Sequence, residues 1–154
     1  NAFKRMQIEG LFPDSVTFLS VSSSCSHSGL INEGQMYYAM MMNTYGMSPS
    51  VEHQTCMVDL FGRAGLFDKA MEFIKNMRSP NYPVWCTLLS SCQTWGNFKL
   101  GHVCFEQAIL VNNSNAAAYT CMANIYANVG LQEEAKRIER MRIEQGSRVG
   151  MVSG

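Results

Sequence analysis

The strongest constraint on the fold of this sequence is a repeat whose three spacings are unequal. Glycines that follow apolar segments stand at positions 29, 65, 96 and 130, which are 36, 31 and 34 residues apart. The same separations recur in three further series: Pro13, Pro49, Pro80 and Ser114; Cys25, Phe61, Cys92 and Tyr126; and the small residues Gly34, Ala70, Gly101 and Ala135. Four series rarely share unequal spacings by chance, so the chain is built from tandem repeats.

Each repeat is predicted to form two helices. Apolar residues recur at helical spacing in 51–64, and Gly65 follows where a left-handed residue ends a helix. Residues 67–77 carry a second apolar stripe with Asp68 as its expected N-cap, and a proline follows. The same plan predicts helices at 16–28, 31–43, 84–95, 98–110, 116–128 and 131–145, and the end of an earlier helix at 2–8.

Stacked pairs of this kind predict an all-α fold, an α-solenoid of antiparallel helix-turn-helix repeats. The first helices of the repeats would line its concave face. We expect the small residues at 34, 70, 101 and 135 where the two helices of one repeat approach closely. The chain divides into the end of a preceding repeat at 1–14, repeats at 15–50, 51–81, 82–115 and 116–149, and a tail at 150–154.

The charge balance and the cysteine content of the chain limit the kinds of partner that it can bind. Lys plus Arg equals Asp plus Glu at 12 each, so no large basic field attracts phosphate backbones, and specific side chains must hold any nucleic acid. The six cysteines form no C-x-x-C pair and lie in apolar runs, as expected for reduced, packed residues. No apolar stretch approaches the roughly 20 residues of a membrane span. The chain begins without Met and ends abruptly at Gly154, so we expect a segment of a longer protein.

Sequence motifs for catalysis are missing. A zinc deaminase pairs H-x-E with P-C-x-x-C, and neither His27, His53 nor His102 stands in such a motif. No glycine-rich phosphate loop occurs either. A Cys/His nucleophile pair remains open on sequence alone, although Cys56 and Cys92 lie on apolar stripes where inert packing is usual. We therefore predict no enzyme activity, no cofactor and no metal site.

Two repeat families share a period near 34 and a helix-turn-helix unit, the tetratricopeptide and pentatricopeptide repeats. Trp85, Leu88 and Tyr119 resemble the first, but Leu89 stands where that family has a small residue, and units of 36 and 31 residues are foreign to it. The alternation of long and short units resembles the PLS subclass of plant organellar pentatricopeptide repeat proteins. The matching stretches are Pro13–Phe18, Cys25–Leu30, Tyr45–Pro49, Val51–His53, Cys56–Gly65, Val84–Cys92, Gly96–Gly101 and Asn124–Gly130.

In that subclass the four repeats resemble an L-type motif at 15–50, an S-type motif at 51–81, and the E1 and E2 motifs at 82–115 and 116–149. Gln54 and Ser114 depart from the pattern, where an aromatic residue and a proline are usual. The resemblance implies a non-catalytic RNA-recognition and recruitment module of an organellar RNA-processing factor, most often for site-specific C-to-U editing. An alternative is a tetratricopeptide-like scaffold that binds a deaminase or editing cofactor rather than RNA.

The implied partners are single-stranded organellar RNA, a cytidine deaminase domain or protein, and editing cofactors, with no membrane. The implied location is the mitochondrion or the chloroplast, with the mitochondrion preferred. The family reads one base per repeat with the fifth and the last residue of a motif. Carried over, these are Leu19 with Ser50, Thr55 with Asn81, Cys86 with Asn115, and Thr120 with a partner near Arg148.

Among these pairs, Thr55 with Asn81 resembles an adenine-preferring combination. Leu19 and Cys86 lack the polar groups for a two-point contact, so their repeats are expected to read weakly or not at all. Without the resemblance, Thr55 is a solvent-facing helix residue and Asn81 is an asparagine that ends a helix.

Overall fold

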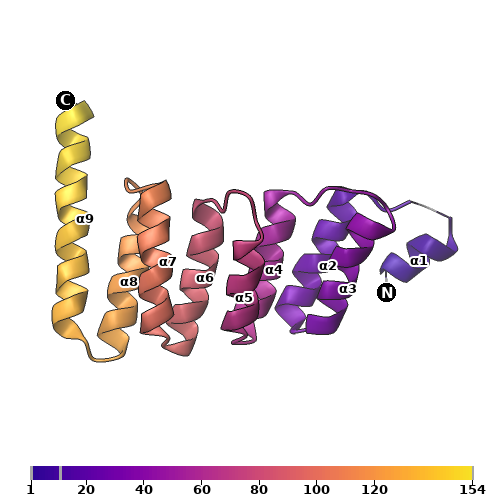
Figure 1. Cartoon of the computed structure of the whole chain (residues 1–154), viewed down its shortest axis with the longest axis horizontal. Helices are drawn as coiled ribbons and strands as arrows, with labels where there is room; N and C mark the ends of the chain where they lie inside the picture. The colour runs from indigo at the N-terminus through magenta and orange to yellow at the C-terminus, as the bar shows by residue number, and fades with distance from the viewer. Residues whose placement is uncertain (1, 11, 154) are drawn as a thin grey trace. The chain divides into compact units, whose positions relative to one another are not determined.

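The computed structural model describes residues 2–10 and 12–153, and its regular elements there are all α-helices (Figure 1). In chain order they are α1 (Ala2–Ile8), α2 (Ser15–Ser28), α3 (Ile31–Asn43), α4 (Val51–Arg63), α5 (Phe67–Lys75), α6 (Tyr82–Trp95), α7 (Phe98–Val111), α8 (Ala116–Asn128) and α9 (Gln132–Ser153). The all-α prediction is confirmed. No helix among the described residues is long and apolar enough to cross a membrane.

Helix starts and ends lie within one residue of the prediction except at three helices, of which α5 ends at Lys75 rather than at the predicted residue 77. Helix α6 begins at Tyr82, two residues early, because Asn81 caps it and Pro83 occupies its first turn, where a missing N–H costs nothing. Helix α9 continues to Ser153 rather than 145, past a glycine that stays helical. The predicted N-cap Asp68 is wrong, since this residue lies inside the first turn of α5.

The repeat glycines end the first helices as predicted. The φ angles of Gly29, Gly65, Gly96 and Gly130 are 70°, 74°, 70° and 85°. At Gly29 and Gly96, the backbone N–H donates back to the carbonyls of the last helical turn, which closes the helix end. Only glycine adopts this left-handed backbone without steric cost, so these positions fix where each helix pair turns.

The chain forms two compact parts, Asn1–Phe73 and Ile74–Gly154. In the first part, α2 packs against α3 and α4. Its core contains Phe3, Phe18, Cys25, Tyr37 and Met41, all nearly fully buried. The Phe3 ring lies 5.5 Å from the Phe18 ring and 5.0 Å from the Tyr37 ring, so α1 is held on the first helix pair by aromatic contacts.

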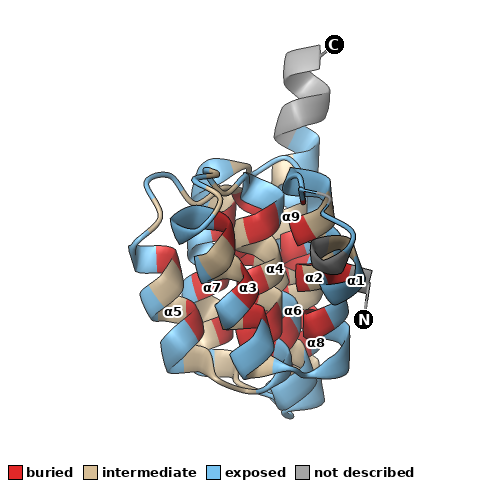
Figure 2. Ribbon diagram, turned by 90° about the vertical axis from the view of Figure 1, so that its right-hand side faces the viewer, coloured by how far each residue is buried: buried red, intermediate tan, exposed pale blue. Residues whose placement is uncertain are grey.

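In the second part, α6 packs on α7 and α8, and α8 packs on α7 and α9. Its fully buried side chains include Leu88, Leu89, Met122, Ile125 and Ile138. Figure 2 marks buried residues in red, on the faces that the helices turn toward one another. The Phe105 and Tyr119 rings meet edge to face at 5.4 Å, which joins α7 to α8.

The small residues of the repeat have a different neighbour from the one predicted. A Cβ atom added to Gly34 would lie 3.4 Å from Cys25 Cβ of the same repeat but 2.5 Å from Leu60 Cδ2 of the next. At Gly101 the nearest atom is Ile125 Cδ1 of the next repeat, at 3.2 Å. The prediction of a close approach within one repeat is therefore incomplete, because the tightest contact joins successive repeats.

Candidate nucleic-acid interface

The last residue of each predicted motif caps the first helix of the next repeat. In every case a side-chain oxygen accepts a hydrogen bond from a backbone N–H in the first turn, which satisfies a donor that the helix leaves unpaired. The pairs are Asp14 with Thr17 at 2.8 Å, Ser50 with His53 at 3.4 Å, Asn81 with Val84 at 3.2 Å and Asn115 with Ala117 at 2.9 Å. Asn81 therefore begins a helix, and its interpretation as a helix-ending residue is wrong.

Each capping side chain uses one oxygen to accept the backbone hydrogen bond, so only its remaining lone pairs and its other polar atoms can contact a ligand. Because Oδ1 of Asn81 and of Asn115 points at a backbone N–H, the amide NH2 group of each remains as a donor. Asn115 and Ser50 are exposed, and Asn81 is half-buried. A donor group is therefore available at the start of α6 and of α8.

The predicted fifth-position residues share one register in the first helices: Leu19 in α2, Thr55 in α4, Cys86 in α6 and Thr120 in α8. Thr120 is exposed, whereas the other three are half-buried, so Thr55 is less open to solvent than the sequence suggested. The Thr55 hydroxyl donates to the Val51 carbonyl at 2.7 Å. Its hydrogen is used inside the helix, and its oxygen remains as an acceptor. The side chain of Arg148, the region expected to pair with Thr120, lies outside the described side chains.

Leu19 lies at the edge of a hydroxyl-lined groove on α2. The groove has a volume of about 530 Å³ and is lined by Leu19, Ser20, Ser23, Ser24, His27 and Ser28. His27 is fixed there, since its Nδ1 lies 2.8 Å from the Ser23 carbonyl oxygen. The surroundings of Leu19 are thus polar even though its own side chain is not.

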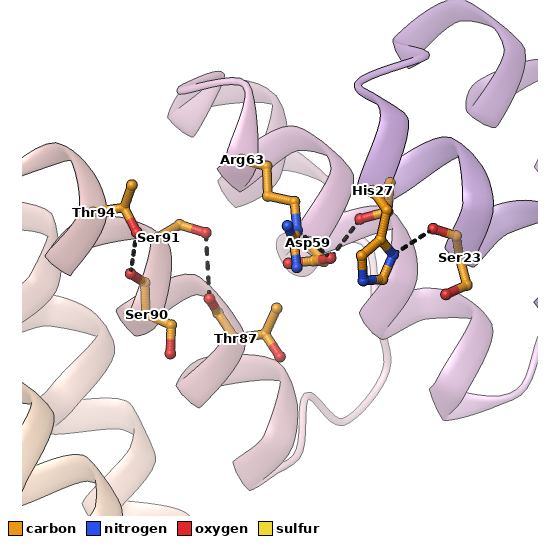
Figure 3. A network of polar contacts seen from close by, with 9 residues as sticks. Ser23, His27, Asp59, Arg63, Thr87, Ser90, Ser91 and Thr94 are labelled. Carbon is orange, nitrogen blue, oxygen red and sulfur yellow. Dashed lines mark hydrogen bonds and ion pairs between the residues drawn. The ribbon is translucent and has the colours of Figure 1, made fainter.

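A polar cluster that sequence reasoning missed joins α2 to α4. The Ser26 hydroxyl donates to the Asp59 carboxylate, and Arg63 Nε donates to the same oxygen at 2.9 Å (Figure 3). Asp59 thereby orients the guanidinium of Arg63, whose side chain remains half exposed. The i, i+4 spacing of Asp59 and Arg63 was a visible signal, but the partner on α2 lies 33 residues away and has no sequence signature.

The hydroxyls of α6 behave differently. Ser91 donates to the Thr87 carbonyl at 3.4 Å, and Thr94 donates to the Ser90 carbonyl at 3.3 Å (Figure 3). These are bonds to the helix's own preceding turn. They leave the hydroxyl oxygens as acceptors and add no contact to another helix.

The cysteines fit inert packing better than nucleophilic chemistry. All six are free, and Cys25, Cys92 and Cys104 are buried while the other three are half-buried. Burial raises the pKa of the Cys56 and Cys86 thiols, and it raises that of Cys121 to about 11. The pKa of Cys104 is raised by a hydrogen bond with Cys92 and by burial. A thiol with a raised pKa supplies little thiolate near neutral pH.

A further candidate for acid–base chemistry is His102 in α7. Its Nδ1 lies 2.8 Å from Tyr126 Oη, and its Nε2 lies 2.5 Å from a Glu106 carboxylate oxygen. Both ring nitrogens are thus occupied by neighbouring side chains, and the contact with Tyr126 ties α7 to α8. Among the described residues, no group of three or more His, Cys, Asp or Glu side chains is arranged to hold a metal ion.

These features define a class, a helical-repeat protein whose first helices carry polar side chains in a common register. The repeat profile described as "PPR repeat" matches residues 55–81. Over its length the chain resembles two Arabidopsis thaliana proteins named as pentatricopeptide repeat-containing. It is 42% identical to At2g22070 over 151 residues, covering 94% of this chain and 19% of that protein. It is 37% identical to the chloroplastic protein CRR2 over 145 residues, which covers 94% of this chain and 22% of that protein.

Among solved structures, the crystal structure of the pentatricopeptide repeat protein PPR10 from maize superposes with a TM-score of 0.72. The overlap covers 94% of this chain and 21% of that one, at 24% sequence identity, which shows that the fold is shared. The chain is a pentatricopeptide repeat protein. In general, repeats of this family read one RNA base per helical repeat with two or three side chains. The chain spans about a fifth of the length of the relatives it matches.

Proposed function

We propose that this chain is an RNA-recognition and recruitment module of an organellar RNA-processing factor, most specifically for site-specific C-to-U editing. The observation that carries the RNA-reading part is the shared register of the polar groups. The last residue of each motif caps the following first helix. Each first helix therefore begins with the last residue of one motif and carries the fifth residue of the next motif about one turn later.

The hydrogen bonds give Thr55 and Asn81 opposite polarity. Thr55 offers an acceptor, because its hydrogen is donated to Val51, and Asn81 offers donors, because its oxygen is used in capping. We keep the family pairing of these two residues as a proposal. One acceptor and one donor complement the exocyclic amino group and the ring acceptor on the Watson–Crick edge of adenine or cytosine. The other bases also present a donor and an acceptor on this edge, so the adenine preference rests on the resemblance and we keep it as a proposal.

The experiment selects RNAs bound by the intact protein from a pool of random single-stranded sequences. Replacing Thr55 with Val removes the hydroxyl at nearly the same volume, and replacing it with Ser keeps the hydroxyl. We expect Thr55→Val to flatten the base preference in one column of the selected sequences and Thr55→Ser to preserve it. If Thr55→Val leaves every column unchanged, base reading by Thr55 is wrong.

The motif type of each repeat, the organelle and the RNA affinity of the repeats are proposed as well. We assign 15–50 and 51–81 to L-type and S-type motifs, and 82–115 and 116–149 to the E1 and E2 motifs of an editing factor. Two relatives are named chloroplastic, which supports an organellar location, and the preference for the mitochondrion stays a prediction. With 12 basic and 12 acidic residues, we expect weak RNA binding by these repeats alone.

A second function, protein recruitment, is favoured by apolar side chains left exposed on α7. Val103, Leu110 and Val111 are 45%, 78% and 52% exposed. Exposed apolar side chains grouped on one helix are typical of protein contacts. We propose that this helix contacts a cytidine deaminase or an editing cofactor. Leu110→Lys would then abolish co-purification with that protein, and unchanged co-purification would exclude this surface.

A further inference from the structure

The buried histidine of the second repeat, His53, has no part in the function proposed so far. It is only 2% exposed although it lies in the first turn of α4. Its Nε2 lies 2.8 Å from the backbone carbonyl oxygen of Ser15, at the start of α2. A carbonyl oxygen only accepts, so Nε2 carries a hydrogen.

The other ring nitrogen of His53, Nδ1, has a different partner, and that partner shows whether Nδ1 carries a hydrogen. The backbone N–H of Ser50 points at His53 Nδ1 over 3.1 Å. A backbone N–H only donates, so Nδ1 carries no hydrogen, because two donors facing each other at this distance would repel. The two bonds independently select the same form of the ring, the neutral tautomer with its hydrogen on Nε2.

This tautomer decides what the Ser50 hydroxyl does. Ser50 Oγ lies 2.6 Å from His53 Nδ1. Since Nδ1 is an acceptor, the hydroxyl donates its only hydrogen to the ring. Ser50 is exposed, so the atom it presents to solvent is an oxygen with a lone pair and no hydrogen to give.

We infer that His53 is a positioning residue that makes Ser50 an acceptor-only contact for an RNA base. The inference rests on the proposed RNA-reading function, in which Ser50 serves the 15–50 repeat. Its partner there, Leu19, offers no polar atom, so Ser50 alone supplies the hydrogen bond. An acceptor-only Ser50 pairs with an N–H of the base edge and rejects a bare ring nitrogen or a keto oxygen. A single hydrogen bond of this kind discriminates by roughly threefold to tenfold.

The test compares two substitutions that cap α4 as well as serine does. Asp and Asn have nearly the same shape and similar N-cap preference, so the helix start is preserved in both. In Ser50→Asp the side chain presents acceptors only, as the inferred Ser50 does. In Ser50→Asn the oxygen caps the helix and the amide presents donors. The intact protein and both variants are used to select from a pool of random single-stranded RNA.

We expect Ser50→Asp to keep the order of bases in one column of the selected RNAs, and Ser50→Asn to invert that order by roughly threefold to tenfold. If Ser50→Asn keeps the order and Ser50→Asp inverts it, Ser50 acts as a donor and the inference is overturned. If the RNAs show a sequence but neither variant changes any column, RNA reading stands and the inference again fails. No selected sequence at all would refute the proposed function, and the inference with it.

The role of His53 has its own pair of variants. Asn places a side-chain oxygen near the position of Nδ1, where it accepts from Ser50, whereas Gln places its amide near the position of Nε2 and leaves Ser50 without that acceptor. We expect His53→Asn to retain the base order in the column that Ser50 controls and His53→Gln to lose it. An equal loss in both variants, or in neither, would contradict the inferred role, because a general loss of packing affects both alike.

Discussion

The close approach at Gly34 predicts how alanine at this position changes stability. A Cβ atom there would lie 2.5 Å from Leu60 Cδ2, well inside van der Waals contact, and Leu60 is 1% exposed. Moving a buried leucine to make room costs about 1–3 kcal/mol. Alanine also favours the helix by about 1 kcal/mol over glycine. We therefore expect Gly34→Ala to lower the free energy of unfolding by about 1 kcal/mol.

The chain supplies a matched control in Gly146 of α9, which is also helical but has no atom within 4 Å of an added Cβ. Gly146→Ala gains the helix preference alone and should stabilise by about 0.5–1 kcal/mol. Urea unfolding followed by circular dichroism measures both variants. A third variant, Leu60→Val, removes the δ carbons, and adding Gly34→Ala to it should stabilise by about 0.5–1 kcal/mol, as at Gly146. If Gly34→Ala stabilises as much as Gly146→Ala, the contact between successive repeats is not as tight as described.

Three further predictions concern the elements that join the repeats. Asn81→Ala should lower the free energy of unfolding by about 1 kcal/mol and Asn81→Asp should leave it nearly unchanged, because only alanine lacks the capping oxygen; equal losses would exclude the cap. Tyr82→Phe should lower the free energy of unfolding in urea by about 1–3 kcal/mol, because the buried N–H of Ala118 loses the hydroxyl that accepts its hydrogen bond at 3.1 Å. An unchanged free energy would show that another group replaces this acceptor. The pKa of Cys121 is raised from 9.0 to about 11 in the folded protein, so the thiol of the unfolded chain ionises first as the pH rises. The free energy of unfolding should therefore fall between these two pH values, and it should fall less in Cys121→Ala, which has no thiol at this position. Parallel pH profiles of the two proteins would contradict this.

The sequence was sufficient to predict the helix pairs because their boundaries depend on local chemistry. The glycines at 29 and 65 and the proline at 80 act on their own backbone, so their spacing predicts where helices end. Asn81 shows the limit of such reasoning. Whether an asparagine ends one helix or begins the next depends on the direction in which its side chain turns, which its position alone does not reveal.

Contacts between repeats were not predictable in the same way. His53 reaches the carbonyl of Ser15 across 38 residues, and Asp59 meets Ser26 across 33. Both depend on how far one first helix slides along the next, and the repeat period does not determine this offset. The same reason explains Gly34, whose sequence signal was a small residue but whose tightest neighbour, Leu60, belongs to the following repeat.

The chemistry of the predicted base-reading positions was predictable only in part. Thr55 was recognised as polar, but its bond to the Val51 carbonyl, which turns the hydroxyl into an acceptor, depends on its side-chain rotamer. Likewise Ser50 was recognised as a motif-ending residue, while the direction of its hydroxyl hydrogen depends on a buried ring from its own helix. Residue type indicates which groups are present, and only the packed structure indicates which of their atoms remain free.

The most direct test of RNA reading by the first helices is ultraviolet cross-linking of the intact protein to single-stranded RNA, with the linked peptides identified by mass spectrometry. If the polar register carries the RNA, the links will fall on α2, α4, α6 and α8, near residues such as Thr55 and Thr120. Links concentrated on the second helices α3, α5, α7 and α9 would contradict this interface.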